Sequence, residues 1–313
     1  MARHVLNKLL SLIPVLLGIS LVAFLLGVIS PGDPAEIALS HSGAEVTLEG
    51  LRDMREQLGL DDPLYIQYFR WLGGAIRGDL GYSYNTKRMV ADELARRLPA
   101  TLQLSAYASL FACLFGFSAG LAGAAYRDKP LDHMVKGLVN AMLSLPAFWL
   151  ALLMILLFSE VLGWLPTSGM GGFRHMIMPA IVLSCAPAAE LARLVRASVI
   201  NEFGKQYYLA ANARGLGKAA LIMRSALPNA VLPTITMLGN YIGSILGGSV
   251  VVESIFALPG VGSFAIEAIY TRDYPALQGY VLLTGFLFVA ITLVVDLICM
   301  LLNPRIRLGG NAL

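Results

Sequence analysis

An all-α membrane protein with six transmembrane helices is the fold class that the sequence predicts. Of its 313 residues, 57% are hydrophobic and only 14% are charged, against roughly 25% charged residues in soluble domains. The mean hydropathy is +0.70. A soluble fold of this length cannot bury so much apolar surface, and the backbone of a segment that crosses lipid must satisfy its own hydrogen bonds. Spanning helices satisfy both conditions.

Six apolar segments approach the ~20 residues that a helix needs to cross the hydrocarbon layer. The fourth, residues 176–194, is the shortest, because only the stretch between Arg174 and Glu190 is uncharged. Glu190 and Arg193 are three residues apart, so they can pair or reach the interface, and the segment is kept as a span. The other five segments are residues 9–29, 101–126, 137–159, 229–252 and 280–302.

The distribution of basic residues predicts that both termini are cytoplasmic. Lys and Arg are concentrated in alternate short connecting segments, whereas the intervening ones contain only Arg174 or Arg272. The first apolar run is long and no small-residue cleavage site follows it, so it is interpreted as a retained helix and not as a signal peptide.

The chain divides into three predicted regions. Residues 1–32 form the N-terminal helix and first span, and residues 33–97 form an external loop region. Within that region, apolar residues at helical spacing over 51–58 and 64–76 predict short amphipathic helices that cap the spans. Residues 98–313 form a five-helix core that includes a cytoplasmic loop at 200–228.

Several classes of function are excluded by what the sequence lacks. The net charge of +3 gives no basic surface for nucleic acid, and the three cysteines lie singly in apolar segments without metal-ligand spacing. No Gly-rich phosphate loop, His-Glu-x-x-His helix or paired intramembrane aspartates occur. The sequence therefore predicts no catalytic residues, no metal site and no cofactor in this chain.

Small residues in the predicted cytoplasmic loop are typical of a docking element. Ala210 and Ala211 favour a helix that another surface can approach closely, and Gly215 permits a tight turn into a second helix over residues 218–227. Close packing of two helices within the chain is the alternative. The charged surroundings favour docking, because lipid-buried packing does not tolerate so many basic groups.

With this spacing, the loop resembles that of the inner-membrane permease subunits of bacterial binding-protein-dependent ABC importers. Ala210, Ala211, Gly215 and the pair 227–228 match the family pattern, while Leu209 and Ser225 depart from it as in the dipeptide, oligopeptide and nickel branch. Further motifs of that branch are Pro31-Gly32-Asp33-Pro34, Leu58-Gly59-Leu60-Asp61-Asp62-Pro63-Leu64-Tyr65, Gly78-Asp79-Leu80-Gly81, Leu98-Pro99-Ala100-Thr101-Leu102, Trp164-Leu165-Pro166, Phe256-Ala257-Leu258-Pro259-Gly260-Val261-Gly262, Arg272-Asp273-Tyr274-Pro275 and Asn303-Pro304-Arg305-Ile306-Arg307.

The resemblance implies the type I ABC importer permease fold in the bacterial inner membrane. It implies four kinds of partner: a homologous second permease, two ATPase subunits that bind ATP and magnesium, a soluble substrate-binding protein, and membrane lipid. The substrate would be a short peptide or nickel, free or chelated. On this basis Ala210, Ala211, Gly215 and Leu216 are the residues expected to couple the chain to its ATPase.

Polar residues inside two predicted spans leave alternatives open. Thr236, Asn240 and Ser244 recur every four residues on one face of the fifth span, where they either line the translocation pathway or hydrogen-bond between helices. Asp296 in the sixth span is expected to pair with Arg193 or Arg196. A secondary transporter or channel subunit for a small polar solute is the alternative function, although no intramembrane charge at midplane or internal repeat supports it.

Overall fold

The computed structural model describes residues 2–30, 32–42 and 45–302. These residues form helices, and the all-α class is confirmed. The chain separates into two compact units. The first comprises Met1–Thr101 and Pro259–Val289, and the second comprises Leu102–Leu258 and Ala290–Leu313.

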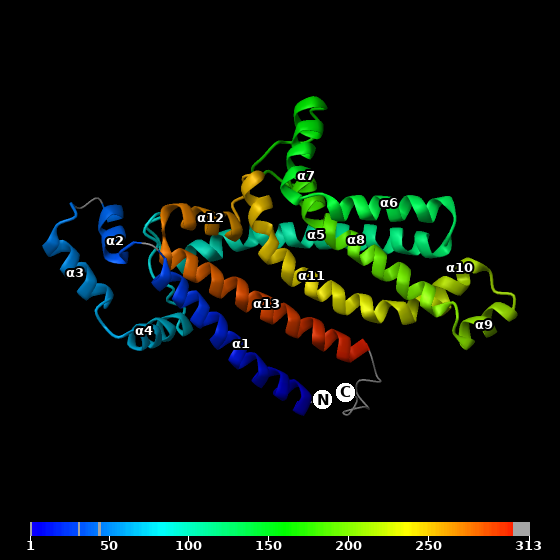
Figure 1. The fold of residues 1–313 in the computed structure, drawn as a ribbon, viewed down its shortest axis with the longest axis horizontal. Coiled ribbons are helices and arrows are strands. Elements are labelled where there is room, and N and C mark those ends of the chain that lie inside the picture. Colours follow the sequence, from blue (N-terminus) through cyan, green and yellow to red (C-terminus); the bar gives the residue numbers. More distant parts are fainter. Residues whose placement is uncertain (1, 31, 43–44, 303–313) are drawn as a thin grey trace. The chain divides into compact units, whose positions relative to one another are not determined.

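The first unit contains the N-terminal helix, a set of short helices and parts of two longer ones (Figure 1). Its helices are α1 (Ala2–Ile29), α2 (Pro34–Ser42), α3 (Leu48–Leu58), α4 (Leu64–Ile76), the beginning of α5 (Val90–Ala125), α12 (Val261–Thr271) and the beginning of α13 (Tyr274–Leu302). The division from the second unit falls within α5 and within α13.

The second unit contains the helices that carry the predicted coupling loop. They are the remainder of α5, α6 (Pro130–Ser144), α7 (Ala147–Met154), the π-helical η1 (Ile155–Val161), α8 (Phe173–Glu202), α9 (Gln206–Ala213), α10 (Lys218–Leu221), the π-helical η2 (Ile222–Ala226), α11 (Leu227–Ile255) and the end of α13.

Local sequence explains where the short helices of the first unit begin and end. The Thr47 hydroxyl accepts the Gly50 N–H at 3.1 Å and caps α3 at its N-terminus. Gly59 ends the same helix at φ +64, a conformation that glycine adopts without steric penalty. Helix α4 occupies residues 64–76, the segment where the apolar spacing predicts a helix.

Four described helices are long and apolar enough to cross a membrane: Leu10–Ile29 within α1, α5, α8 and Tyr274–Ile298 within α13. The fifth predicted span forms the 29-residue helix α11. Many side chains of α11 lie outside those that the structure describes, so the count of six spans stays a prediction.

The third predicted span is not one straight helix. Helix α6 and the α7–η1 segment form a pair bent by 103°. Leu145 lies at the bend with φ −87 and ψ 124, an extended conformation. Pro146 explains the break, because a proline disfavours helical backbone at the preceding residue and lacks an N–H donor. The hydrophobicity of this segment was interpreted correctly, but its continuity was not.

Helix α8 is the most buried of the candidate spans, with 56% of its apolar window inside the protein. It packs against α6, α7 and α11. Gly116 and Gly120 of α5 allow close approach, because a Cβ at either would lie within 3 Å of Leu191 or Val195 side-chain atoms. The weakest of the six predicted spans is therefore the central helix of its unit, which explains why it need not be uniformly apolar.

Candidate coupling site

The predicted coupling loop forms a short helix, a glycine turn and a second helical segment. Helix α9 begins after Lys205, whose backbone is extended, and ends at Ala213. Gly215 then has φ +78, and nothing lies within 4 Å of the position that a Cβ would take. The turn therefore needs glycine for its backbone conformation and not for lack of space. Figure 1 shows α9 and α10 at the end of α8 away from α7.

The four residues predicted to couple to an ATPase do not share one face. Ala210 and Gly215 are exposed. Ala211 and Leu216 are only partly exposed and pack against a buried apolar cluster of the second unit. The exposed surface of α9 also includes Leu209, which the sequence analysis treated as a departure from the family motif. Of the four predicted coupling residues, only Ala210 and Gly215 are therefore fully available to a partner on the exposed surface.

Tyr208 anchors α9 to the rest of the unit. Its side chain is buried in the same cluster as Val199 and Ile222, and its ring lies 5.0 Å from the ring of Phe203. Burial raises the pKa of the Tyr208 hydroxyl above its usual value. This anchor was not identified from the sequence, although a tyrosine between exposed positions of a short helix is a signal for it.

A buried carboxylate fixes the corner between α8 and α9. Glu202 is the last residue of α8, and its side chain pairs with Lys205 Nζ at 2.7 Å. The Tyr207 hydroxyl donates a hydrogen bond to the other carboxylate oxygen. Because Glu202 is buried, these partners offset its desolvation, and they set the direction in which α9 leaves α8.

A second buried carboxylate ties α6 to α8. Asp132 accepts hydrogen bonds from Arg196 Nε at 2.7 Å and Nη2 at 2.8 Å. Lys136 Nζ lies 2.9 Å from the same carboxylate, and the Asp128 N–H donates to it at 3.0 Å. The sequence analysis expected Arg193 or Arg196 to pair with Asp296, and the structure shows Arg196 bound to Asp132. Residues 64 positions apart in the chain gave no local signal for this pair.

The predicted pathway residues Thr236, Asn240 and Ser244 lie in α11. Their side chains are outside those that the structure describes, so the interpretation of this stripe stays a prediction. Gly239 in the same helix packs against Val295 of α13, where a Cβ would come within 3 Å of the valine side chain. Close packing thus occurs on at least one face of α11.

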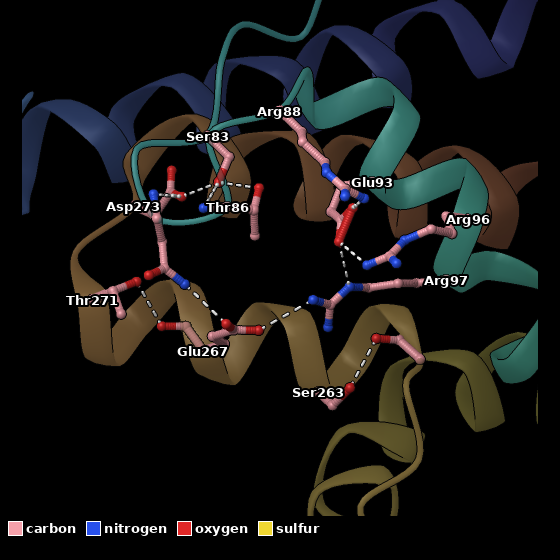
Figure 2. A network of polar contacts seen from close by, with 12 residues as sticks. Ser83, Thr86, Arg88, Glu93, Arg96, Arg97, Ser263, Glu267, Thr271 and Asp273 are labelled. Atoms are coloured by element: carbon pink, nitrogen blue, oxygen red, sulfur yellow. Dashed lines mark hydrogen bonds and ion pairs between the residues drawn. The ribbon is translucent and has the colours of Figure 1, made fainter. Parts of the chain in front are cut away.

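A polar network in the first unit holds the loop before α5 (Figure 2). Glu93 pairs with Arg96 and with Arg97 Nε at 3.3 Å, and Arg88 lies 3.8 Å away. Arg97 also reaches Glu267 of α12 at 3.3 Å. Asn85 donates to that glutamate, and Ser83 donates to the buried Asp273 carboxylate. The motif around residue 273 carries no local sequence signal for this network.

Within the part of the chain that the structure describes, no three His, Cys, Asp or Glu side chains gather as a metal site would require. The candidate site is an exposed helix and turn, with Tyr208 and Glu202 holding α9 against the rest of the unit.

Apolar helices of spanning length indicate an integral membrane protein. Two family matches identify it further. The family described as binding-protein-dependent transport system inner membrane component matches residues 112–308, and the corresponding N-terminal membrane component matches residues 1–105. The chain belongs to this family of inner membrane components.

Relatives of known name cover almost the whole chain. The glutathione transport system permease protein GsiC of Escherichia coli O6:H1 (strain CFT073) is 39% identical over 307 residues, which are 98% of this chain and 99% of that protein. The protein of the same name from Shigella flexneri serotype 5b (strain 8401) is 38% identical with the same coverage.

Solved structures support the fold. An inward-facing structure of the MetNI methionine ABC transporter matches with a TM-score of 0.57 at 20% identity, covering 67% of this chain and 96% of that chain. An amino acid ABC transporter crystallised with histidines matches with a TM-score of 0.51 at 19% identity, covering 68% and 94%. The permease fold is thereby confirmed.

The chain is therefore a permease of a binding-protein-dependent ABC importer, located in the inner membrane. Its family implies an ATPase and a substrate-binding protein as partners. This membership decides against the alternative of a secondary transporter or channel subunit.

Proposed function

We propose that this chain forms one half of an import channel for short peptides, and that α9 receives the movement of a separate ATPase. The observation that carries the coupling role is the exposed α9–Gly215 turn, held rigidly from behind by Tyr208 and Glu202. A helix anchored in this way transmits a push from its exposed side to α8 as a rigid-body movement.

The peptide substrate is supported by the relatives, whose names give glutathione transport. Between the two substrate classes expected from the sequence, short peptides are therefore preferred over nickel. Substrate selection is assigned chiefly to the external binding protein. ATP and magnesium are assigned to two ATPase subunits, and a homologous second permease completes the channel.

The proposed orientation places both termini and α9 in the cytoplasm and residues 33–97 outside. It rests on the distribution of basic residues in the short connecting segments. In this orientation the stripe of Thr236, Asn240 and Ser244 crosses the membrane in α11 and contributes polar groups to the pathway. Replacement of Asn240 by Trp should then abolish uptake while ATP hydrolysis continues. Unimpaired uptake would assign the stripe to helix packing.

Two glycines of the turn provide a matched test of the coupling role. Gly215 and Gly217 both have open space around a Cβ, but only Gly215 has a positive φ. Gly215→Val forces a β-branched residue into the left-handed region, at a cost of about 1–3 kcal/mol, and reorients α9. Gly217→Val carries no such strain.

The measurement is peptide-stimulated ATP hydrolysis by the complete importer in proteoliposomes. Gly215→Val should reduce the stimulation at least tenfold while the complex still assembles, and Gly217→Val should retain at least half of it. Equal stimulation in the two variants would contradict the assignment of this turn to coupling.

A further inference from the structure

The first unit contains a cavity of about 620 Å³ lined by charged side chains, here called the rim, and by aromatic and apolar side chains, here called the floor. It lies between α1, α3, α4 and the beginning of α13. Asp33, Arg55 and Arg70 contribute the charged groups of its lining, and Gln67 adds an amide. The function described above makes no use of this cavity.

The rim offers groups of both charges. Arg55 Nη1 pairs with Asp33 at 2.7 Å and its Nε with Asp61 at 3.2 Å, while Arg70 pairs with Asp62. A guanidinium carries five N–H donors, so an arginine held by carboxylates on one side retains donors for a phosphate. Asp33 beside it is an acceptor for an ammonium group. The rim thus matches a zwitterion that carries phosphate and ammonium.

The floor of the cavity is aromatic and apolar. The Phe24 ring lies 5.9 Å from the Trp71 ring and 5.5 Å from the Tyr68 ring, and Phe24 and Trp71 both line the cavity. The Tyr68 hydroxyl shares a hydrogen bond with the Ser20 hydroxyl at 2.8 Å. Aromatic side chains with a polar edge are typical of the membrane–water interface, where headgroups meet acyl chains.

An apolar groove of about 390 Å³ lies along α1, α4 and α13, three of the helices that line the cavity. Ile13, Leu17, Leu72 and Phe286 are among the residues of α1, α4 and α13 that line it. From Val28 in the cavity to Ile13 in the groove, α1 advances ~22 Å at 1.5 Å per residue. One leaflet with its headgroups is about 20–22 Å thick, half of the ~40–45 Å bilayer. Cavity and groove together therefore have the length of one phospholipid.

The two flanking helices bury little of their apolar surface within this chain. In the most apolar stretch of each helix, only 22% of the residues of α1 and 6% of those of α13 are buried. A peptide would match the charged rim but has no use for the adjoining apolar groove. The combination favours a lipid over a soluble zwitterion.

We propose that cavity and groove bind one phospholipid of the outer leaflet whose headgroup carries a phosphate and a primary ammonium, as in phosphatidylethanolamine. Arg55 and Arg70 bind the phosphate, Asp33 accepts from the ammonium, and an acyl chain occupies the groove. The outward location rests on the orientation given under the proposed function, whereas binding itself does not depend on the coupling role of α9.

Native mass spectrometry of the complete importer tests this proposal. The complex is delipidated in detergent and then offered phosphatidylethanolamine or phosphatidylglycerol, which lacks the ammonium. We expect one phosphatidylethanolamine to be retained per copy of this chain, with at least fivefold lower retention of phosphatidylglycerol. Equal retention of the two lipids, or of neither, would overturn the assignment.

Variants locate the lipid. Arg55→Gln with Arg70→Gln should lower retention at least fivefold by removing the phosphate donors. Ala75→Trp, which fills the groove without touching the ion pairs, should do the same even if the arginine variant folds poorly. Leu26→Trp, on a part of α1 that lines neither space, is the matched control and should retain the lipid.

Retention that survives Ala75→Trp would contradict the proposal, as would a segment of the second permease or a peptide found in this space. Uptake of peptide is recorded on the same preparations. Loss of lipid with normal coupling by the α9 turn would separate the lipid site from the proposed transport mechanism, so the two can fail independently.

Discussion

Each unit has a buried carboxylate surrounded by basic groups, yet the two are built differently. In the second unit, Asp132 is fully buried and accepts from Arg196, Lys136 and a backbone N–H. In the first unit, Glu93 is 2% exposed, and its partners Arg88 and Arg96 are 58% and 61% exposed. Glu93 Oε2 has no hydrogen bond among the described residues, whereas both oxygens of Asp132 do.

This difference shows how the same chemistry serves two purposes. A carboxylate whose two oxygens both accept from a bidentate arginine joins two helices in one geometry, as Asp132 does for α6 and α8. Glu93 is instead shared among three arginines, of which Arg88 and Arg96 stay exposed to water while Arg97 is 14% exposed, and it orders the segment that leads into α5. We infer that the second unit uses its ion pair for rigidity near the coupling site, and the first unit uses its network to order the loop before α5.

The largest effect is expected at Asp132. Asp132→Ala leaves Arg196, which is 22% exposed, without its bidentate partner. Breaking a buried pair on one side costs about 3–5 kcal/mol, and the partial exposure of Arg196 favours the lower value. Thermal unfolding of the purified complex should show a clear fall in its midpoint. The control is Asp128→Asn at an exposed pair, which removes the charge while keeping a residue suited to the backbone φ of 60° there, and is expected to change stability by less than about 1 kcal/mol. Equal midpoints for the two variants would remove the distinction.

A smaller effect is expected at Glu93. Glu93→Gln removes the shared charge, but Arg88 and Arg96 stay hydrated and the largely buried Arg97 keeps its pair with Glu267, so the cost should be about 1–2 kcal/mol. The same measurement, repeated with limited proteolysis of residues 77–89, should show faster cleavage of that loop. A loss of stability as large as that of Asp132→Ala would show that the two carboxylates depend equally on their basic partners.

Conservative arginine substitutions sharpen the comparison further. Arg196→Lys keeps the charge but loses the bidentate geometry, and should cost about 1 kcal/mol. Arg96→Lys in the exposed network should change stability by less than about 0.5 kcal/mol. Unfolding midpoints of the two single variants check this. A larger loss of stability for Arg96→Lys than for Arg196→Lys would contradict the view that the Asp132 pair is the more tightly held of the two.

The smallest effect at neutral pH is expected at Tyr84, in the loop of the first unit. Burial, followed by the neighbouring Asp273 carboxylate, raises the pKa of Tyr84 to about 12. Folding therefore favours the neutral phenol, and this contribution is complete below the ordinary pKa of ~10 and lost as the pH rises through 12. The stability difference between wild type and Tyr84→Phe should be constant up to about pH 9.5 and shift against the wild type above it. A constant difference to pH 12 would show that Tyr84 ionises freely.

Hydrophobic patterns predicted the helical membrane fold, because the cost of exposing polar backbone to lipid acts on every residue of a span. They did not predict that α5 begins at Val90, since Glu93, Arg96 and Arg97 interrupt the apolar pattern, although their i,i+3 and i,i+4 spacing was a local signal for a helix. The bend at Pro146 had a local signal that hydropathy outweighed. The pair Asp132–Arg196 had none.

The candidate site shows the same limit. The Ala/Gly motif located α9 and its turn, but the sequence could not separate the outward Ala210 from the inward Ala211, because that distinction depends on the cluster around Tyr208. Neighbouring residues of a helix point about 100° apart, so Ala210 and Ala211 lie on different faces. Which of these faces is buried is decided only by tertiary contacts.

The contact between α9 and an ATPase is the central claim, and photo-crosslinking tests it most directly. A photoreactive phenylalanine analogue is placed at Ala210, which is exposed on α9, or at Tyr65, which is exposed on α4 in the proposed external region. In the assembled importer, position 210 should crosslink to the ATPase subunit and position 65 should not. An ATPase adduct absent from position 210, or formed equally at position 65, would contradict the account.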